Sequence, residues 1–295
     1  MIHARGGTQA GRDYRQGLRE RAPGCENRRA GSSPSRTFMP ADTHPDVAVE
    51  FRDVCYRLDH GATLLHHLNL AVRRGELLVL LGRSGSGKTT SLKLINRLLE
   101  PSSGQVMVEG RASTHWDPIQ LRRKIGYAIQ EVGLFPHFSV ERNIGLVPAL
   151  QGWPRQRIQE RVRELLQLVG LEPQIAARRP SELSGGQRQR VGVARALAAD
   201  PPILLMDEPF GALDALTRAE LQREFLALQR RLGKTTVFVT HDLREALLLG
   251  SRIALLEAGR LLATYTPNQF LHAKEPLAAA YVAAFHTGNS PQGGA

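Results

Sequence analysis

Cysteine is almost absent from this sequence. Its 295 residues include only Cys25 and Cys55, and the chain has no CxxC pair or other spacing typical of metal ligands. Small secreted domains usually depend on disulfides, and structural zinc sites depend on clustered cysteines and histidines. We therefore expect a protein of a reduced, cytosolic compartment in which neither thiol has a special role.

Long apolar runs are also missing. A helix that crosses a membrane needs about 20 consecutive apolar residues, whereas the longest runs here, such as residues 77–81, have the length of a buried strand. If the protein works at a membrane, other chains must supply the membrane-spanning part. A length of 295 residues allows one large α/β domain or two smaller ones.

Acidic residues are too few to balance the basic ones, which leaves a formal net charge of +11. A basic protein suggests a nucleic-acid function, but residues 1–38 alone contribute +5, from eight arginines against three acidic residues. This segment is rich in Gly, Ser and Pro, so residues 1–44 are expected to form a disordered basic extension. Two explanations stay open: translation begins at Met39, or the basic tail contacts anionic lipid headgroups.

The rest of the chain alternates between predicted strands and helices. Residues 47–56 and 65–72 alternate apolar and polar side chains, as half-buried strands do. Residues 76–81 form a continuous apolar run, as expected of a central strand buried on both faces. Further strands are predicted at 105–109, 203–207, 235–240 and 252–257, and helices at 88–98, between Pro154 and Gly170, and between Asp214 and Gly233.

The order of these elements indicates the fold class. Apolar strands that alternate with helices are typical of a mostly parallel sheet covered on both faces. From about residue 132 to residue 186 the pattern changes to helices alone. We interpret this block as a helical subdomain inserted into an α/β domain.

Residues 82–90, GRSGSGKTT, are the first candidate site. The spacing fits the phosphate loop G-x-x-x-x-G-K-[ST], and the stretch lies between a predicted buried strand and a predicted helix, as the motif requires. Glycines allow the backbone to curl around a phosphate with its N–H groups turned inward. Lys88 is expected to bridge the β- and γ-phosphates, and the Thr89 hydroxyl to bind Mg²⁺. The predicted nucleotide-binding residues of the loop are Gly82, Arg83, Ser84, Gly85, Ser86, Gly87, Lys88, Thr89 and Thr90.

Two carboxylates end the predicted strand at 203–207. Asp207 is placed to hold Mg²⁺, directly or through water. Glu208 is placed to polarise an attacking water as a general base. An acidic pair at a strand end is more often a solvated turn, but a phosphate loop upstream favours the functional interpretation.

A histidine, His241, ends the predicted strand at 235–240. That strand is expected to lie beside the one that ends at Asp207, so the histidine would reach the same sheet edge. His241 then has either an electrostatic role at the γ-phosphate or a structural one. Spacing alone does not decide between the two.

A second candidate for phosphate binding is LSGGQRQRV, residues 183–191. Ser184 is expected to cap a helix, and the glycines after it leave backbone N–H groups at the positive end of the helix dipole. The chain therefore has two phosphate-binding loops about a hundred residues apart, and this duplication needs an explanation.

The glycine loop, LSGGQ, the acidic strand end and the strand-end histidine occur in this order in the nucleotide-binding domains of ATP-binding cassette (ABC) proteins. The chain resembles that family over residues 45–285, and LSGGQ, the family signature, is more specific than the phosphate loop. The resemblance implies a P-loop NTPase fold with a mostly parallel sheet core, an antiparallel β part and the inserted helical subdomain. It also implies ATP hydrolysis with Mg²⁺, in which Lys88, Glu208 and His241 are the catalytic residues.

The same resemblance explains the two phosphate loops. In ABC proteins two domains meet head to tail, and each signature closes on the ATP held by the phosphate loop of the other domain. This chain is therefore expected to form a homodimer, or a pair with a close homologue, around shared ATP sites. The residues implied to contact the partner's ATP are Leu183, Ser184, Gly185, Gly186 and Gln187.

Three further residues receive roles from the resemblance. Tyr56, 26 residues before Gly82, resembles the aromatic that stacks on adenine, with a strand-packing tyrosine as the alternative. Gln130 resembles the glutamine that contacts Mg²⁺ and links the ATP site to the membrane partner. The implied metal ligands are then Thr89, Gln130 and Asp207. Asp214 matches the loop that contacts the other domain, and it is equally placed to be only a helix N-cap.

Residues 125–153, 93–104 and 204–218 resemble the importers of quaternary amines, the glycine betaine, choline and carnitine osmoprotectant systems. Related importers of nitrate, sulfonates or amino acids share parts of these segments. The implied partners are transmembrane permease subunits, which residues 125–153 are expected to face, and indirectly an extracytoplasmic substrate-binding protein. The chain would then be a peripheral protein on the cytoplasmic face of the cell membrane.

A soluble ABC ATPase acting on nucleic acid or ribosomes is the alternative that the positive charge suggests. Such members carry two cassettes or a long coiled coil, and neither is visible here, so we expect no nucleic-acid partner. Several importer ATPases continue into a tandem regulatory module. This sequence stops about ten residues after residue 285, so we expect no such module and only a flexible tail at 286–295.

Overall fold

A computed structural model describes residues 46–287, with the exception of residues 131 and 212. The predicted N-terminal extension and the predicted tail beyond residue 287 lie outside the described residues. Residues 286 and 287, which the prediction assigned to the tail, belong to the last helix. Each helix of the described part is too short or too polar to span a bilayer.

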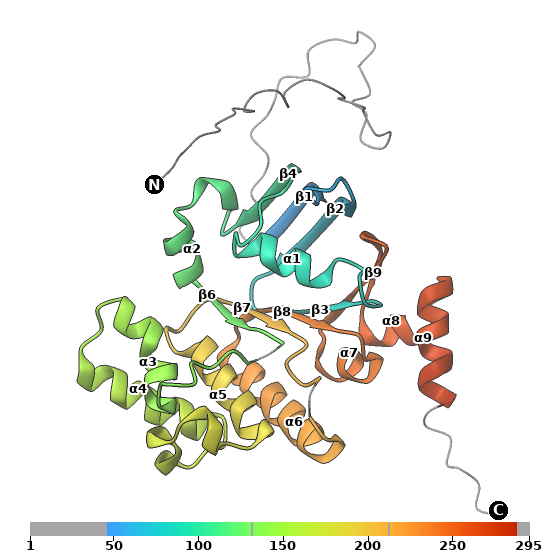
Figure 1. Cartoon of the computed structure of the whole chain (residues 1–295). Coiled ribbons are helices and arrows are strands. Elements are labelled where there is room, and N and C mark those ends of the chain that lie inside the picture. Colours follow the sequence, from blue (N-terminus) through green and yellow to red (C-terminus); the bar gives the residue numbers. More distant parts are fainter. Residues whose placement is uncertain (1–45, 131, 212, 288–295) are drawn as a thin grey trace, which may run out of the picture. The chain divides into compact units, whose positions relative to one another are not determined.

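A six-stranded, mostly parallel sheet lies at the centre of the described domain (Figure 1). Strands β9, β3, β8, β7 and β6 pair in parallel in this order, and β10 pairs antiparallel with β9 at one edge. All residues of β3, β7 and β8 are buried, which confirms the predicted central strand and sheet type. The strands are β3 (Leu77–Leu81), β6 (Ile125–Ala128), β7 (Ile203–Asp207), β8 (Thr235–Thr240), β9 (Arg252–Glu257) and β10 (Arg260–Tyr265).

A four-stranded antiparallel sheet of order β2-β1-β4-β5 forms a second layer. Helix α1 (Lys88–Ile95) lies between the two sheets, because Leu92 and Leu94 belong to the core cluster that both sheets share (Figure 1). This helix is shorter than predicted and ends before Arg97, which adopts a left-handed φ of 54°. The strands of the second sheet are β1 (Val47–Arg57), β2 (Thr63–Arg73), β4 (Ser103–Val108) and β5 (Arg111–Ala112).

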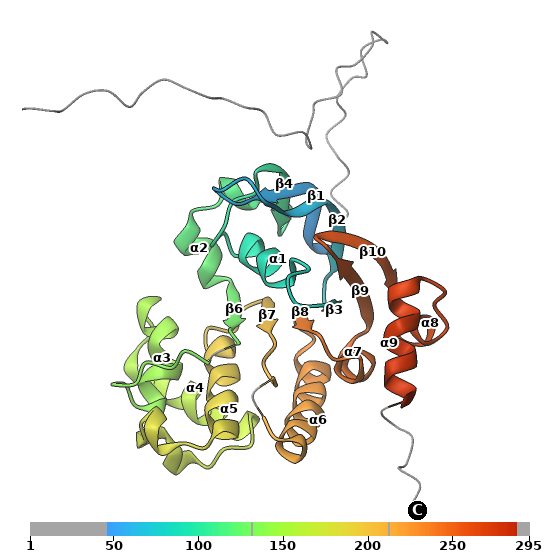
Figure 2. The same cartoon turned by 45° about the vertical axis from the view of Figure 1, so that its right-hand side comes forward.

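Helices cover the other face of the central sheet (Figure 2). Pro154 precedes α4, and Asp214 and Gly233 bound α6, as predicted. The apolar faces predicted for α4 and α6 pack into the same core cluster. The helices are α3 (Val140–Leu150), α4 (Arg155–Leu168), α5 (Gly185–Leu197), α6 (Ala215–Leu232) and α7 (Leu243–Leu249), with two short 3₁₀ helices at Pro173–Ala177 and Pro180–Glu182.

Several short elements are absent from the sequence-based prediction. One is strand β6, which contains Gly126. A Cβ atom at this position would lie 2.2 Å from the carbonyl oxygen of Ala196, so glycine allows α5 to approach the sheet closely. Contacts of this kind leave no local periodicity. The other elements are β5, β10, α2 (Pro118–Arg123), α7, α8 (Pro267–Leu271) and α9 (Pro276–Thr287), with a 3₁₀ turn at Ser113–His115.

Three aromatic rings connect the central sheet to the helices below it. Phe210 lies in the loop after β7, Phe225 on α6 and Phe238 on β8. Their ring centroids lie 5.7–6.1 Å apart. Each ring is at least 96% buried. Tilted and edge-to-face pairs at such distances add to the stabilisation that burial alone supplies.

Replacing Phe238 by alanine should lower the free energy of unfolding by about 3–5 kcal/mol, because neighbouring side chains fill the resulting cavity only in part. Urea unfolding followed by circular dichroism measures the loss. Leu248→Ala, at a position 44% exposed on α7, is the control and should change stability by less than about 0.5 kcal/mol. An equally small effect of Phe238→Ala would contradict the buried position of this ring.

Candidate functional site

Three neighbouring parallel strands end at one edge of the central sheet and bring the candidate residues together. Leu81, at the end of β3, pairs with Thr240, at the end of β8, and Asp207 of β7 pairs with Val239. The loops that follow these strands therefore start side by side. The predicted adjacency of the acidic strand and the histidine strand is confirmed.

The glycine loop has backbone angles that glycine adopts without strain, with φ values of 79° at Gly85 and 94° at Gly87. Gly87 precedes α1, and a Cβ there would lie 2.5 Å from Leu65 Cδ2. Inside the loop, Lys88 Nζ donates to the carbonyl oxygens of Gly82 at 2.7 Å and Arg83 at 2.9 Å. The ammonium group of Lys88 is thus held within the curl of the loop.

Two polar groups of this loop, an ammonium and a hydroxyl, are buried, and the interactions around them do not fully replace the water that they lose. Lys88 is only 5% exposed, and burial lowers the pKa of its ammonium group, although the nearby Glu208 and Asp207 oppose the shift. The Ser86 hydroxyl oxygen is buried and has no hydrogen-bond partner. An orphaned hydroxyl and a desolvated cation at a helix start suit an anion that would pair with both.

Asp207 is 4% exposed and accepts two hydrogen bonds. The Thr89 hydroxyl donates to Asp207 Oδ1 at 3.0 Å, and the Tyr127 hydroxyl donates to Oδ2 at 3.3 Å. Burial raises the pKa of Asp207, while both hydrogen bonds act in the opposite direction. Burial and the Asp207 carboxylate raise the pKa of Tyr127. Tyr127 is a site residue that sequence reasoning missed, because no motif marks it and its strand β6 was not predicted.

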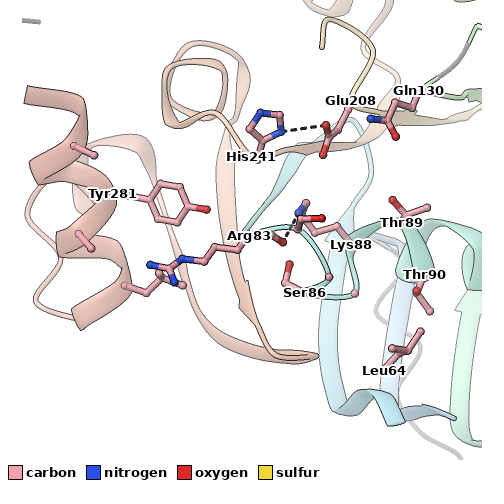
Figure 3. Close-up of a pocket in the computed structure, with 16 residues that line it drawn as sticks. Leu64, Arg83, Ser86, Lys88, Thr89, Thr90, Gln130, Glu208, His241 and Tyr281 are labelled. Atoms are coloured by element: carbon pink, nitrogen blue, oxygen red, sulfur yellow. Dashed lines mark hydrogen bonds and ion pairs between the residues drawn. The ribbon is translucent and has the colours of Figure 1, made fainter. Parts of the chain in front are cut away.

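Glu208 and His241 form a direct pair at the mouth of the site (Figure 3). His241 Nδ1 lies 3.0 Å from Glu208 Oε2. Glu208 has a left-handed φ of 44°, and its backbone N–H donates to the carbonyl oxygen of Val239 at 3.1 Å. Strained conformations of non-glycine residues often persist at functional sites, where the surroundings enforce them.

These side chains surround a cavity of about 760 Å³. Its lining includes residues 83–90 of the glycine loop together with Gln130, Glu208 and His241. Figure 3 shows that Gln130 lies beside Glu208, and that Tyr281 of α9 points toward the glycine loop from the opposite side. Sequence reasoning missed the wall formed by α9 and one residue of β2. These lining residues are Leu64, Leu277, Ala280, Tyr281 and Ala284.

The α9 residues that line the cavity have helical spacing, so a helix could have been predicted there, but not what it would contact. Tyr56 is absent from the cavity lining. It is half-buried and packs against the core cluster between the two sheets. Tyr56 therefore packs as a strand residue against the core, which was the alternative to stacking on adenine. A contact between Tyr56 and adenine stays a prediction.

The LSGGQ segment lies apart from this cavity. Ser184 caps α5, as predicted: its hydroxyl accepts from the N–H of Gln187 at 3.2 Å, and Gln187 Oε1 accepts from the N–H of Ser184 at 3.0 Å. Leu183 is buried, whereas Ser184 and Gly185 are exposed. Helices α1 and α5 lie on opposite faces of the central sheet (Figure 2), and no residue of 183–187 lines the cavity.

Asp214 is also outside the cavity and exposed. Its carboxylate caps α6 by accepting from the N–H of Thr217 at 3.0 Å, which lowers the pKa of Asp214. The N-cap interpretation is confirmed, and a contact with another domain stays a prediction.

A buried carboxylate contacts the residue that precedes the histidine. Glu245 of α7 is 4% exposed and accepts from the Thr240 hydroxyl and from Gln222 Nε2, the latter at 3.0 Å. Thr240 directly precedes His241, and Gln222 lies on α6. Burial is the main cause that raises the pKa of Glu245.

Comparisons with known proteins agree with this arrangement. Residues 65–211 match the family described as ABC transporter. The chain is 54% identical to the glycine betaine/carnitine/choline transport ATP-binding protein OpuCA of Bacillus subtilis (strain 168), over 72% of this chain and 56% of OpuCA. It is 51% identical to the glycine betaine uptake system ATP-binding protein YehX of Escherichia coli (strain K12), over 76% of this chain and 72% of YehX. The chain thus spans little more than half the length of several curated relatives that it matches.

Solved structures show the same fold. The dimeric post-hydrolysis state of the ATP-binding cassette MJ0796, bound to ADP and Pi, is 33% identical with a TM-score of 0.67, over 74% of this chain and 98% of that one. CbiO1 from Clostridium perfringens, part of the ABC transporter complex cbiONQ, is 27% identical with a TM-score of 0.71, over 82% of this chain and 98% of that one. The predicted P-loop NTPase fold with its two sheets and helical block is confirmed.

The raised pKa of Glu245 predicts a pH dependence of stability. Because the folded-state pKa lies above the ordinary value of 4.5, the stability that this group contributes is full below that value and is lost as the pH rises through the raised pKa. Glu245→Gln stays neutral at every pH. The unfolding free energy of the wild type, relative to this variant, should therefore fall as the pH rises above 4.5, the ordinary value of the glutamate pKa.

Urea unfolding at several pH values measures this difference. Asp200→Asn is a control for which the change of stability with pH should have the opposite direction, because a hydrogen bond from Lys234 lowers the pKa of Asp200. Its stabilising contribution should be lost as the pH falls through the lowered pKa. A wild-type advantage over Glu245→Gln that does not change with pH would contradict the assignment.

Proposed function

The chain belongs to the ABC transporter family, as a protein related to its ATP-binding subunits, and from this premise we propose that it hydrolyses ATP to energise import of a small solute. The solute proposed is a quaternary amine osmoprotectant such as glycine betaine. One observation carries the proposal: Lys88, Glu208 and His241 line a single cavity at one edge of the sheet. Asp207 accepts a hydrogen bond from Thr89, which lines the same cavity.

The glycine loop is proposed to bind the phosphates of ATP. In the described state Lys88 Nζ donates to two loop carbonyls, and we infer that it transfers these bonds to the β- and γ-phosphates. The N–H groups of residues 84–89 and the Ser86 hydroxyl would then gain acceptors. Charge-assisted hydrogen bonds of this kind are about twice as strong as neutral ones.

Thr89, Gln130 and Asp207 are the residues proposed to hold Mg²⁺. Their donor atoms are oxygens, which Mg²⁺ prefers, and the Thr89 hydroxyl already contacts Asp207. Among the described residues there is no cluster of three His, Cys, Asp or Glu side chains, which suits a metal held jointly by protein, phosphates and water. When bound, Mg²⁺ neutralises charge on the phosphates.

Glu208 is proposed as the general base and His241 as the group that holds the γ-phosphate. The 3.0 Å contact between them orients the histidine and fixes the carboxylate beside the cavity. Glu208 would take a proton from the attacking water, while His241 and Lys88 stabilise the charge on the phosphate oxygens.

Two copies of the chain, or a pair with a close homologue, are proposed to share the ATP sites. The exposed Ser184 and Gly185 lie at the positive end of the α5 dipole and are proposed to bind an anion, and they do not line the cavity of the glycine loop in their own chain. A second copy would supply a glycine loop beside them. Asp214, exposed beside this segment at the start of α6, is proposed to contact the second copy.

Residues 125–153 are proposed to contact transmembrane permease subunits at the cytoplasmic face of the membrane. Phe135 is 41% exposed and Leu150 is 62% exposed, so this region presents apolar side chains to a partner. An extracytoplasmic binding protein would capture the solute, and uptake of nitrate, sulfonates or amino acids is the alternative. No nucleic-acid partner is proposed.

Uptake of labelled glycine betaine at high salt tests the function. Cells that lack this gene should take up less glycine betaine than cells that carry it, and the wild-type allele should restore the uptake. Lys88→Ala should not, because loss of the ammonium contacts is expected to weaken nucleotide binding by about 10- to 100-fold. Uptake that is independent of the gene would contradict the osmoprotectant assignment, and full restoration by Lys88→Ala would contradict the role of the glycine loop.

A further inference from the structure

Tyr127 lies next to the acidic strand end, although no motif of the sequence assigns it a role. It belongs to β6, an edge strand of the central sheet, which pairs in parallel with β7 (Figure 1). Tyr127 pairs with Leu205, two residues before Asp207. Because side chains alternate between the two faces of a sheet, Leu205 and Asp207 point to the same face. The phenol of Tyr127 reaches this face too, since its hydroxyl contacts the Asp207 carboxylate.

The carboxylate of Asp207 is held from two sides. Tyr127 donates to its Oδ2 at 3.3 Å from β6, and Thr89 donates to its Oδ1 at 3.0 Å from α1. The terminal torsion of an aspartate side chain has a broad energy well. Two donors on different oxygens therefore fix a carboxylate orientation that the torsion itself leaves free.

The hydroxyl of Tyr127 acts toward Asp207 only as a donor. Burial and the neighbouring carboxylate raise the pKa of Tyr127, so the phenol stays protonated at neutral pH. An ionised carboxylate only accepts hydrogen bonds, which gives this one a single possible direction. The ring of Tyr127 is half-buried and packs against the core cluster between the two sheets. This packing keeps the hydroxyl beside Oδ2.

The orientation of Asp207 matters because it decides where the Thr89 hydroxyl points. A hydroxyl has one proton and two lone pairs. The proton of Thr89 is directed to Asp207 Oδ1, so the lone pairs of its oxygen are left for another partner. Thr89 lines the cavity, whereas Asp207 and Tyr127 do not. The two residues behind Thr89 thus leave its oxygen available to a cation in the cavity, and oxygen is the ligand type that Mg²⁺ prefers.

We propose that Tyr127 is a positioning residue for the divalent cation that accompanies the nucleotide. By holding Oδ2 of Asp207, it keeps Oδ1 on the proton of Thr89 and so keeps the Thr89 oxygen available to the cation. Loss of a residue that orients metal ligands in this way typically costs about 10- to 100-fold in metal affinity. The inference rests on the proposed function, because it requires a nucleotide that binds together with Mg²⁺.

Nucleotide binding with and without Mg²⁺ tests the proposal in the full chain. The probe is AMP-PNP, an ATP analogue that resists hydrolysis, and calorimetry measures its Kd in excess Mg²⁺ and in EDTA. Tyr127→Phe keeps the ring and removes the donor. It should raise the Kd in Mg²⁺ by about tenfold. The Kd in EDTA should stay within about twofold of the wild type, because the glycine loop is unchanged.

Tyr265→Phe is the matched control, since it removes the same hydroxyl from another strand. Tyr265 lies on β10, and its ring packs edge-to-face against Phe270 with a centroid distance of 5.4 Å. It does not line the cavity. Both Kd values of this variant should therefore stay within about twofold of the wild type.

A double-mutant cycle asks whether Tyr127 acts through Asp207. Asp207→Ala should itself raise the Kd for AMP-PNP in Mg²⁺. In this background Tyr127→Phe should cost no more than about twofold further, because the effects of residues that act through one another are not additive. Losses that multiply would show that Tyr127 acts by another route and would overturn the proposal.

The comparison of the two conditions separates the possible failures. An unchanged Kd in Mg²⁺ for Tyr127→Phe would overturn the proposal. Equal losses in Mg²⁺ and in EDTA would overturn it too, because they would indicate a displaced glycine loop and not a misdirected cation ligand. A wild type that binds AMP-PNP no more tightly in Mg²⁺ than in EDTA would contradict the proposed role of Mg²⁺ itself, and the inference would fall with it.

Discussion

The parallel pairing of β3, β8 and β7 is the constraint on which the site depends. Leu81 pairs with Thr240 and Asp207 with Val239, so three loops from distant parts of the sequence begin at one sheet edge. In a parallel sheet, ligand sites characteristically form beyond the carboxyl ends of the strands. All residues of these strands are buried, so a shift in register would break the core and the site together.

The groups gathered at this edge are arranged at a cost to the protein. Lys88 and Asp207 are almost completely buried, and burial disfavours the charged form of each side chain. The buried hydroxyl of Ser86 has no hydrogen-bond partner. Glu208 has a left-handed backbone conformation, which is strained for a residue other than glycine. Under the proposed function, a phosphate and a cation in the cavity would offset the buried charges of Lys88 and Asp207 and would give the Ser86 hydroxyl a partner.

Sequence reasoning succeeded where the signal is local. Apolar runs predicted β3, β7 and β8, and capping residues predicted the starts of α5 and α6. It missed Tyr127 and the α9 wall, because their relation to the site depends on contacts between distant segments. Tyr56 illustrates the limit of spacing: its distance from the glycine loop matches a family pattern, yet its side chain packs against the core. The hydrogen bonds from Arg195 of α5 to the carbonyl oxygens of Val132 and Gly133 likewise leave no periodic pattern in the sequence.

The central claim is that two chains share each ATP, because the signature and the glycine loop of one chain lie apart. The most direct test is light scattering of the Glu208→Gln variant in Mg-ATP, since loss of the proposed base should leave binding intact and prevent reopening of the dimer. The account predicts a stable dimer that forms with Mg-ATP and dissociates with ADP. A variant that binds ATP with unchanged affinity and remains monomeric would contradict it.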